Sequence, residues 1–190
     1  MIEILIAGLF IHNYITVQFL GICPFLGMSK KVDTALGMGI AVTFVMVITS
    51  LITYPLFRYV LTPLNIEYLE IIVFIFVIAA IVQIIEMVLR KMSPTLYKSM
   101  GVYLPLITTN CCILGVAELN LISDLVTNVF TACLNGLFSG LGFTLAILIL
   151  AGLREKLDRL PINKNFKGFS ISMITACFMA MAFYVFKFVA

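Results

Sequence analysis

Cys23 to Gly27 reads Cys-Pro-Phe-Leu-Gly, and Cys111 to Gly115 reads Cys-Cys-Ile-Leu-Gly, so one pattern, Cys-x-x-Leu-Gly, occurs twice at a spacing of 88 residues. Both copies lie in apolar runs that are long enough to cross a membrane but are interrupted by Gly and Pro. Matched interrupted segments in the two halves of a membrane protein point to a site near the middle of the bilayer. Because the repeated residue is a thiol, we expect a site for a soft metal rather than for a sugar or an amino acid.

The composition is that of an integral membrane protein. Of the 190 residues, 63% are hydrophobic and 11% are charged, and the mean hydropathy is +1.18, whereas a soluble domain has about 25% charged residues. The N-terminus lacks the basic region of a cleaved signal peptide, so we expect the first helix to be retained. With no linker between domains, residues 1–190 are predicted to form a single transmembrane domain in contact with lipid and not with nucleic acid.

Six apolar segments each approach the roughly 20 residues that a helix needs to cross a bilayer. They cover residues 4–24, 34–57, 68–89, 100–117, 128–152 and 169–189. The sequence therefore predicts an all-α integral membrane fold with six transmembrane helices. Three spans in each half, about 1–90 and 91–190, reverse the direction of the second half, which predicts two inverted-topology three-helix repeats with broken first helices. After the motifs, the Gly-rich stretch 36–43 pairs with 141–148 in this repeat.

The distribution of basic residues predicts the orientation in the membrane. Arg58 and Lys187 lie on one side, and the other ten of the twelve Lys and Arg residues lie in the first, third and fifth loops. These ten are Lys30, Lys31, Arg90, Lys91, Lys98, Arg154, Lys156, Arg159, Lys164 and Lys167. The positive-inside rule places those three loops in the cytoplasm. We therefore predict a multi-pass protein of a bacterial or archaeal cytoplasmic (inner) membrane, with both termini outside.

Proline and small polar residues accompany both motifs. Pro24 follows Cys23, and Pro105 precedes the second motif; a proline inside a span is expected to remove one helical hydrogen bond. A backbone group left free in lipid is costly unless protein or water satisfies it. The residues just before Cys111 that can satisfy the backbone or orient the thiol are Thr108, Thr109 and Asn110. One such kink is common in membrane helices, but two kinks at matching motifs favour a functional site.

Counting thiols predicts a partner. The chain has five cysteines, of which Cys23 and Cys111 align in the repeat. Cys112 points roughly 100° away from Cys111 on a helix, and we interpret it, with Cys133 and Cys177, as a small packing residue. A [2Fe–2S] cluster normally takes four thiolates, so two motif thiols provide half a site. The other two must come from a second chain, either a copy or a relative.

Other polar residues within the spans have simpler interpretations. His12, next to Asn13 in the first span, is expected to be satisfied by a neighbouring carbonyl rather than to bind a ligand. Glu86 lies four residues before Arg90, a favourable spacing for a helical ion pair, and Gln83 lies on the same face. If a cation path exists, Gln83 and Glu86 are the first residues to test.

Two further patterns are interpreted as structural. Gly136-x-x-x-Gly140 in the fifth span is typical of close packing between membrane helices. The run at 154–159, Arg-Glu-Lys-Leu-Asp-Arg, is expected to be a solvated cytoplasmic loop.

The motifs and their surroundings resemble a known family. The stretch 19–31, Phe-Leu-Gly-Ile-Cys-Pro-Phe-Leu-Gly-Met-Ser-Lys-Lys, resembles the N-terminal signature of the A subunits of Rnf complexes, as do 104–111 (Leu-Pro-Leu-Ile-Thr-Thr-Asn-Cys) and 90–97 (Arg-Lys-Met-Ser-Pro-Thr-Leu-Tyr). The resemblance covers nearly the whole chain. The same small superfamily contains the D and E subunits of the sodium-pumping NADH:quinone reductase.

The resemblance implies a function. It implies a six-helix inverted-repeat fold, pairing with a homologous E subunit, and a [2Fe–2S] cluster held in the membrane by two cysteines from each partner. By motif these are Cys23 and Cys111; the presence of Cys112 beside Cys111 leaves the identity of the second ligand open. It also implies a non-catalytic role within an enzyme complex that exchanges electrons between ferredoxin and NAD and moves Na⁺ or H⁺, with flavins and further iron–sulfur centres on other subunits.

Three other functions compete with this interpretation. Within the superfamily, the chain is close to an E-type subunit of the Na⁺-translocating quinone reductase. A small-solute transporter with inverted repeats would need a polar or ionisable pocket, where these spans offer thiols, Thr and Asn. A membrane thiol–disulfide oxidoreductase would use Cys23 and Cys111 without iron.

Overall fold

The computed structural model of the protein describes residues 13–64, 67–92, 104–122, 126, 128–159 and 168–189. Within these ranges all regular elements are helical and no strand occurs. The longer helices are α3 (Val32–Leu56), α5 (Glu70–Met92), α8 (Cys111–Ile122), α9 (Val129–Asp158) and α10 (Phe169–Val189). The shorter elements are α2 (Ile22–Met28), the π-helical turn η2 (Phe57–Leu61), α4 (Thr62–Leu64), the 3₁₀ turn η3 (Glu67–Leu69) and α7 (Leu104–Thr108). This all-helical architecture confirms the predicted fold class.

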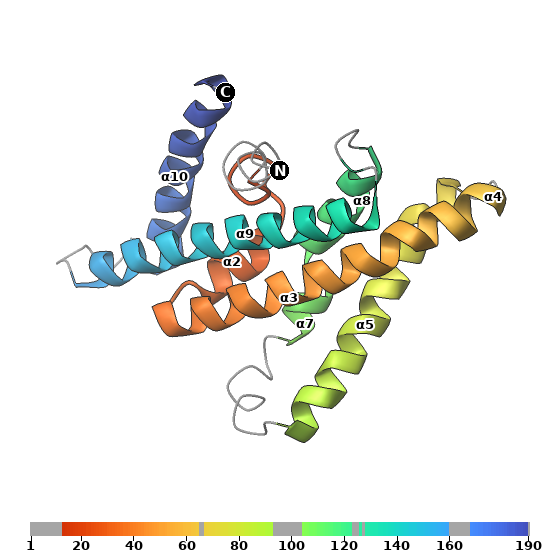
Figure 1. The fold of residues 1–190 in the computed structure, drawn as a ribbon. Coiled ribbons are helices and arrows are strands. Elements are labelled where there is room, and N and C mark those ends of the chain that lie inside the picture. Colours follow the sequence, from red (N-terminus) through yellow and green to blue (C-terminus); the bar gives the residue numbers. More distant parts are fainter. Residues whose placement is uncertain are drawn as a thin grey trace.

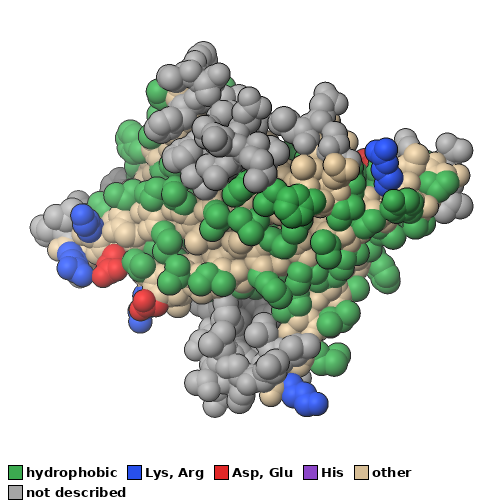
Figure 2. All heavy atoms as spheres, in the orientation of Figure 1, with side chains coloured by type: hydrophobic (Ala, Val, Ile, Leu, Met, Phe, Trp, Pro, Cys, Tyr) green, Lys and Arg blue, Asp and Glu red, His purple; other side chains and the backbone are tan. Residues whose placement is uncertain are grey.

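Several of these helices are long and apolar enough to cross a membrane. They cover Val32–Leu61, Glu70–Met87, Pro105–Ile122 and Val129–Asp158, and Phe169–Val185 is a shorter apolar helix. Figure 2 shows hydrophobic side chains over the middle of the visible face and charged side chains toward its extremities. Each of the second to sixth predicted spans overlaps one of these segments. In the first span, residues 4–12 lie outside the described ranges, so the count of six helices and the complete repeat of 1–90 with 91–190 stay predictions.

The centre of the structure is an antiparallel pair of long helices, α3 and α9 (Figure 1). Gly39 on α3 lies against Thr144 on α9, and Gly140 on α9 lies against Thr43 on α3. A Cβ added to either glycine would lie 2.6 or 2.7 Å from the opposing threonine Cγ2. The two threonine Oγ1 atoms are 3.2 Å apart and share a hydrogen bond. Glycine is therefore required at both positions for the two backbones to approach this closely.

The contacts between α3 and α9 are reciprocal. Gly39-x-x-x-Thr43 and Gly140-x-x-x-Thr144 face one another crosswise, and each threonine Oγ1 lies 2.8 Å from the glycine carbonyl oxygen four residues earlier. Because each hydroxyl has one proton, one threonine donates to its glycine carbonyl while the other can donate across the helix pair. Such an arrangement is expected where an inverted repeat brings its two second helices together. The pairing of 36–43 with 141–148 that the sequence suggested sets Gly39 opposite Thr144, and these two residues do meet. By symmetry the reciprocal contacts relate residues 39 and 43 to 140 and 144, about one helical turn away, so the register of the repeat stays a prediction.

The predicted close-packing motif in the fifth span is confirmed. Gly136 lies against α3 as well: a Cβ there would lie 2.7 Å from Ser50 Oγ and 3.2 Å from the Met46 carbonyl oxygen. Nearby, Asn120 on α8 donates to Ser50 Oγ at 3.1 Å and accepts from Asn135 on α9 at 2.7 Å. Buried polar side chains thus join α3, α8 and α9 at the end of the pair away from the motifs.

The expectation of a solvated loop at 154–159 is wrong for most of that run. Helix α9 continues to Asp158, because Arg, Glu, Lys and Leu are good helix formers and because Glu155 and Arg159 form an ion pair of 3.0 Å one turn apart. Those two side chains are exposed, but Arg154 is only 7% exposed and points into the protein. A run of charged residues therefore contains one buried cation that the sequence pattern did not single out.

Replacing Gly140 by alanine should destabilise the helix pair. The added Cβ would lie 2.8 Å from the Thr43 Cα, a backbone atom that cannot rotate away, and overpacking of this kind costs about 1–3 kcal/mol. We expect Gly140→Ala to lower the thermal unfolding temperature of the purified protein in detergent.

The matched control is Gly152→Ala on the same helix. A Cβ at Gly152 meets nothing within 4 Å, and alanine is the better helix former, so this variant should be neutral or slightly more stable. Equal unfolding temperatures for the two variants would contradict the proposed close packing.

Candidate functional site

The structure brings the two Cys-x-x-Leu-Gly motifs together. The backbone N–H of Gly21 donates a hydrogen bond to the Sγ of Cys111, with an N···S distance of 2.9 Å. Gly21 has a φ of 79°, a left-handed conformation that glycine adopts without cost. A Cβ at this position would lie 3.0 Å from the Cβ of Cys112 and 3.1 Å from Asn110 Oδ1. Glycine is therefore needed two residues before Cys23, both for the backbone conformation and for contact with the second motif.

A turn at residues 13–21 precedes the first motif and is anchored to α9. Asn13 is 1% exposed; its Oδ1 accepts from the backbone N–H groups of Ile15 and Thr16 at 3.2 and 3.4 Å, and its Nδ2 donates to the Gly142 carbonyl at 3.1 Å. One buried amide thus satisfies backbone groups of two distant segments. His12 lies outside the described residues, so the expectation about its partner is untested.

Helix α2 begins at Ile22, so the break in the first span lies before the motif and not at the proline. Cys23 is the second and Pro24 the third residue of this helix. The expectation that Pro24 removes a helical hydrogen bond is wrong, because amides in the first turn of a helix have no partner within the helix. The same holds for Pro105, the second residue of α7. Both prolines start helices, which is where proline is tolerated best.

The second break lies between α7 and α8, at Thr109 and Asn110. Thr109 Oγ1 donates to the Pro105 carbonyl at 2.9 Å. Asn110, which is 4% exposed, caps α8: its Oδ1 accepts from the Cys112 N–H at 3.1 Å. Asn110 satisfies a backbone group at the break, as predicted, and fixes the first turn that carries Cys111. The Thr109 hydroxyl adds a second donor to a carbonyl that already accepts the Thr109 backbone N–H at 3.1 Å. Thr108 is half-buried at the end of α7.

The cysteines differ sharply in exposure. Cys23 and Cys111 are exposed, whereas Cys112 is 0% exposed and packs in the hydrophobic core. This contrast follows from the angle of about 100° between consecutive residues on a helix. Cys133 on α9 is half-buried, and Cys177 on α10 is exposed. The two thiols that share the repeated motif are therefore both exposed, as Cys177 also is, whereas the neighbour of Cys111 is buried.

Helices α2 and α8 start at one point and run apart along α9. At the start, the Cβ position of Gly21 is 3.3 Å from the ring of Phe143. Farther on, α2 reaches Arg154 through the Leu26 carbonyl, whereas α8 reaches Asn135 in the opposite direction along α9. The N-terminus of the twelve-residue α8 therefore points toward the thiols, and the positive end of its dipole favours negative charge there.

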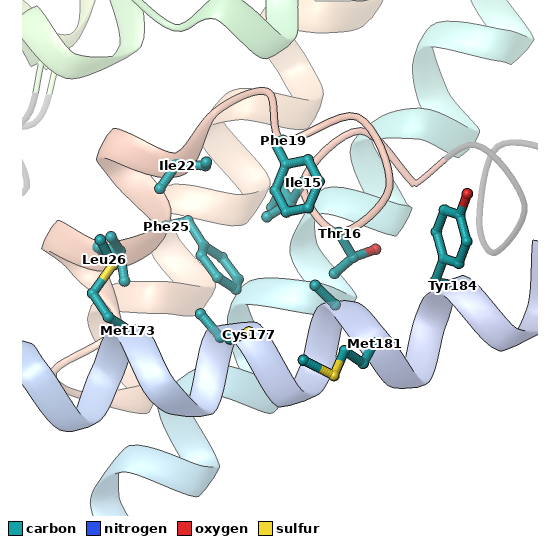
Figure 3. Close-up of a pocket in the computed structure, with 12 residues that line it drawn as sticks. Ile15, Thr16, Phe19, Ile22, Phe25, Leu26, Met173, Cys177, Met181 and Tyr184 are labelled. Carbon is teal, nitrogen blue, oxygen red and sulfur yellow. The ribbon is translucent and has the colours of Figure 1, made fainter.

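An apolar cavity of about 590 Å³ lies beside the first motif (Figure 3). It is enclosed by the turn and α2 on one side, with Phe19, Ile22 and Phe25, and by α10 on the other, with Cys177 and Met181. Its lining is almost entirely hydrocarbon, with the hydroxyl of Thr16 as one of few polar groups. The exposed Cys177 thus faces an apolar wall.

Two thiols do not complete a metal site. Among the described residues, no group of three or more His, Cys, Asp or Glu side chains is placed to hold a metal ion. Gln83 is exposed and Glu86 half-buried on α5, which packs against α7 and α8. The side chain of Arg90 is not described, so the predicted Glu86–Arg90 pair is untested. Cys23 and Cys111 together supply two thiols, half the number that a four-thiolate site needs.

The whole chain matches known membrane proteins. A family model described as "Rnf-Nqr subunit, membrane protein" covers residues 1–190. The A subunit of the Na⁺-translocating ferredoxin:NAD⁺ oxidoreductase complex of Acetobacterium woodii is 51% identical over 183 residues, which are 96% of this chain and 94% of that protein. The A subunit of the ion-translocating oxidoreductase complex is 50% identical in Syntrophotalea carbinolica over 184 residues (96% and 94%) and 50% identical in Actinobacillus pleuropneumoniae serotype 5b over 182 residues (96% and 93%).

Removing the cap at Asn110 should loosen the start of α8. Asn110→Ala leaves the Cys112 N–H without its acceptor, and loss of such a cap costs about 1 kcal/mol. We expect a lower unfolding temperature of the complex, and Asn110→Ser, which keeps a capping oxygen, should recover most of it. An Asn110→Ser variant as unstable as Asn110→Ala would show that capping is not the role of this side chain.

Proposed function

This chain belongs to the Rnf-Nqr family of membrane subunits, and we propose that it is the A subunit of an ion-translocating ferredoxin:NAD⁺ oxidoreductase complex. The resemblance inferred from the motifs is confirmed by the family match over the whole chain. Identities of 50–51% to named A subunits support this assignment over an E-type quinone-reductase subunit. As one subunit of a larger oxidoreductase complex, it works with other membrane subunits in the cytoplasmic membrane, and we propose that both termini face outward.

The proposed role within the complex is to hold half of a [2Fe–2S] cluster. Cys23 and Cys111 would each supply one thiolate, and a homologous E-type subunit would supply two more. The observation that carries this proposal is the 2.9 Å hydrogen bond from Gly21 N–H to Cys111 Sγ, because it joins the turn two residues before the first motif to the first residue of the second motif. Thiolates are the ordinary ligands of such clusters, so the donor set fits.

The residues around the thiols suit this role. When bound, a [2Fe–2S] cluster supplies a one-electron carrier inside the membrane. The chain presents both thiols outward, where a partner subunit can reach them, and keeps the Cys112 thiol in the core. Phe25 and Leu26 of the first motif are buried and exclude water from the space behind Cys23.

Substitution of the two motif cysteines tests this role. In the complex purified anaerobically, Cys23→Ser and Cys111→Ser should each abolish one [2Fe–2S] EPR signal and lower the bound iron. The EPR signal and the bound iron should both remain in three matched single variants, Cys112→Ser, Cys133→Ser and Cys177→Ser. Cys112→Ser is the most informative control, since it removes the thiol next to Cys111 and leaves Cys111 itself unchanged.

Each rival function gives a different result in the same preparations. An unchanged EPR signal in Cys23→Ser and Cys111→Ser would overturn the cluster assignment. A protein without iron in which Cys23 and Cys111 form a disulfide would be a thiol–disulfide oxidoreductase. Saturable solute binding that survives both substitutions would indicate a transporter.

We further propose that the chain takes part in coupling electron flow to Na⁺ or H⁺ movement. Its relative from Acetobacterium woodii is named for Na⁺ translocation. Gln83 and Glu86 on α5 are the proposed ion-path residues. Glu86→Gln and Gln83→Ala should reduce ion uptake into vesicles several-fold while the iron content stays normal. Normal uptake in both variants would remove α5 from the path.

A further inference from the structure

Arg154 connects the end of α9 to the first motif. Its Nη1 donates to the Leu26 carbonyl and to Ser29 Oγ, both at 2.9 Å. Leu26 is the leucine of the first Cys-x-x-Leu-Gly motif, and Ser29 follows the last residue of α2. One buried guanidinium therefore fixes the end of the short helix whose start carries Cys23.

The charge of Arg154 is not cancelled by a carboxylate in the described part of the chain. The ion pair found there joins Arg159 to Glu155, both exposed. The groups that Arg154 does contact, a carbonyl and a hydroxyl, are neutral. A buried cation with neutral partners leaves a positive potential around it, and in a low-dielectric interior this potential is weakly screened.

The positive charge lies close to the proposed ligand. Leu26 follows Cys23 by three residues, so about 4.5 Å of helix axis separates them. At an effective dielectric constant of about 20, a unit charge about 10 Å away changes an ionic equilibrium by about tenfold. Arg154 is therefore near enough to influence how much negative charge the site can hold.

We propose that Arg154 is a positioning residue of the thiol site: it holds α2, and with it Cys23, in place, and its buried positive charge favours the more reduced, more negative state of a group bound by Cys23 and Cys111. This inference rests on the proposed function. It adds a residue from α9, in the other half of the sequence from Cys23, that acts through the end of the motif helix rather than by ligation.

The test is a redox titration of the purified complex followed by EPR. Arg154→Gln should lower the midpoint potential of the EPR signal that depends on Cys23 and Cys111 by about 59 mV. This shift corresponds to about a tenfold change in the one-electron equilibrium constant. Arg154→Lys keeps the charge and should restore most of the wild-type potential. A purely structural role predicts that lysine and glutamine shift the potential alike, or that neither does, and either result would overturn the proposal.

Arg159→Gln is the matched control. It removes one arginine from the same helix, but that side chain is 78% exposed and paired with Glu155, so its charge is screened and the potential should not move. A shift equal to that of Arg154→Gln would mean that the net charge of the complex, and not the buried guanidinium, sets the potential.

A second pair of variants decides the question if Arg154→Gln does not assemble. Ser29→Asp places a carboxylate beside Arg154 and neutralises its charge while the arginine remains, so it should lower the potential as Arg154→Gln does. Ser29→Asn is the uncharged control and should leave it nearly unchanged; equal potentials in these two variants would refute the electrostatic role. A wild-type complex without a signal that depends on Cys23 and Cys111 would instead refute the proposed function itself.

Discussion

A peptide group that leaves a helix inside a membrane must find its hydrogen-bond partner within the protein, and this requirement shapes the region around the two motifs. At each break, a side chain supplies the hydrogen bonds that water would supply to backbone groups at a protein surface. Asn13 and Asn110 satisfy the turns before α2 and α8, and Arg154 satisfies the far end of α2. The Gly21 N–H differs from the other freed backbone groups, because its hydrogen-bond acceptor is the sulfur of Cys111. The interruption of the first helix and the contact of its turn with Cys111 therefore have one cause.

The breaks are tolerated because an unbroken pair of helices supports them. Helices α3 and α9 approach closely at Gly39 and Gly140 and present a continuous surface, and α9 supplies partners to both half-helices along its length. The Gly142 carbonyl receives Asn13, whereas Asn135 reaches α8. A long regular helix thus provides the fixed points from which two short irregular segments are positioned.

Hydropathy predicted the helical membrane fold and most of the span positions, because these depend on local composition, and the resemblance of the motif stretches predicted the family. The same reasoning identified the polar cluster before Cys111 and the difference between Cys111 and Cys112 in packing. It missed Asn13, Gly21 and Arg154 as structural partners, since each acts on a segment at least 90 residues away. It also assigned the break to Pro24, although proline is permitted in a first helical turn. A glycine just before a proline-containing helix start was the available signal for Gly21. The shared cluster, the ion path and the orientation remain predictions.

The unequal lengths of the two half-helices have an electrical consequence. Helix α2 has 7 residues and α8 has 12. With a rise of about 1.5 Å per residue, α2 spans about 10 Å and α8 about 18 Å. Because both helices begin at the turn that joins the two motifs, their far ends lie at unequal distances from it.

The negative C-terminal end of α8 is about 18 Å from that starting point, whereas that of α2 is about 10 Å away. The opposing field of the far end is therefore weaker for α8, so the longer half-helix makes the larger contribution to the positive potential where the two helices begin.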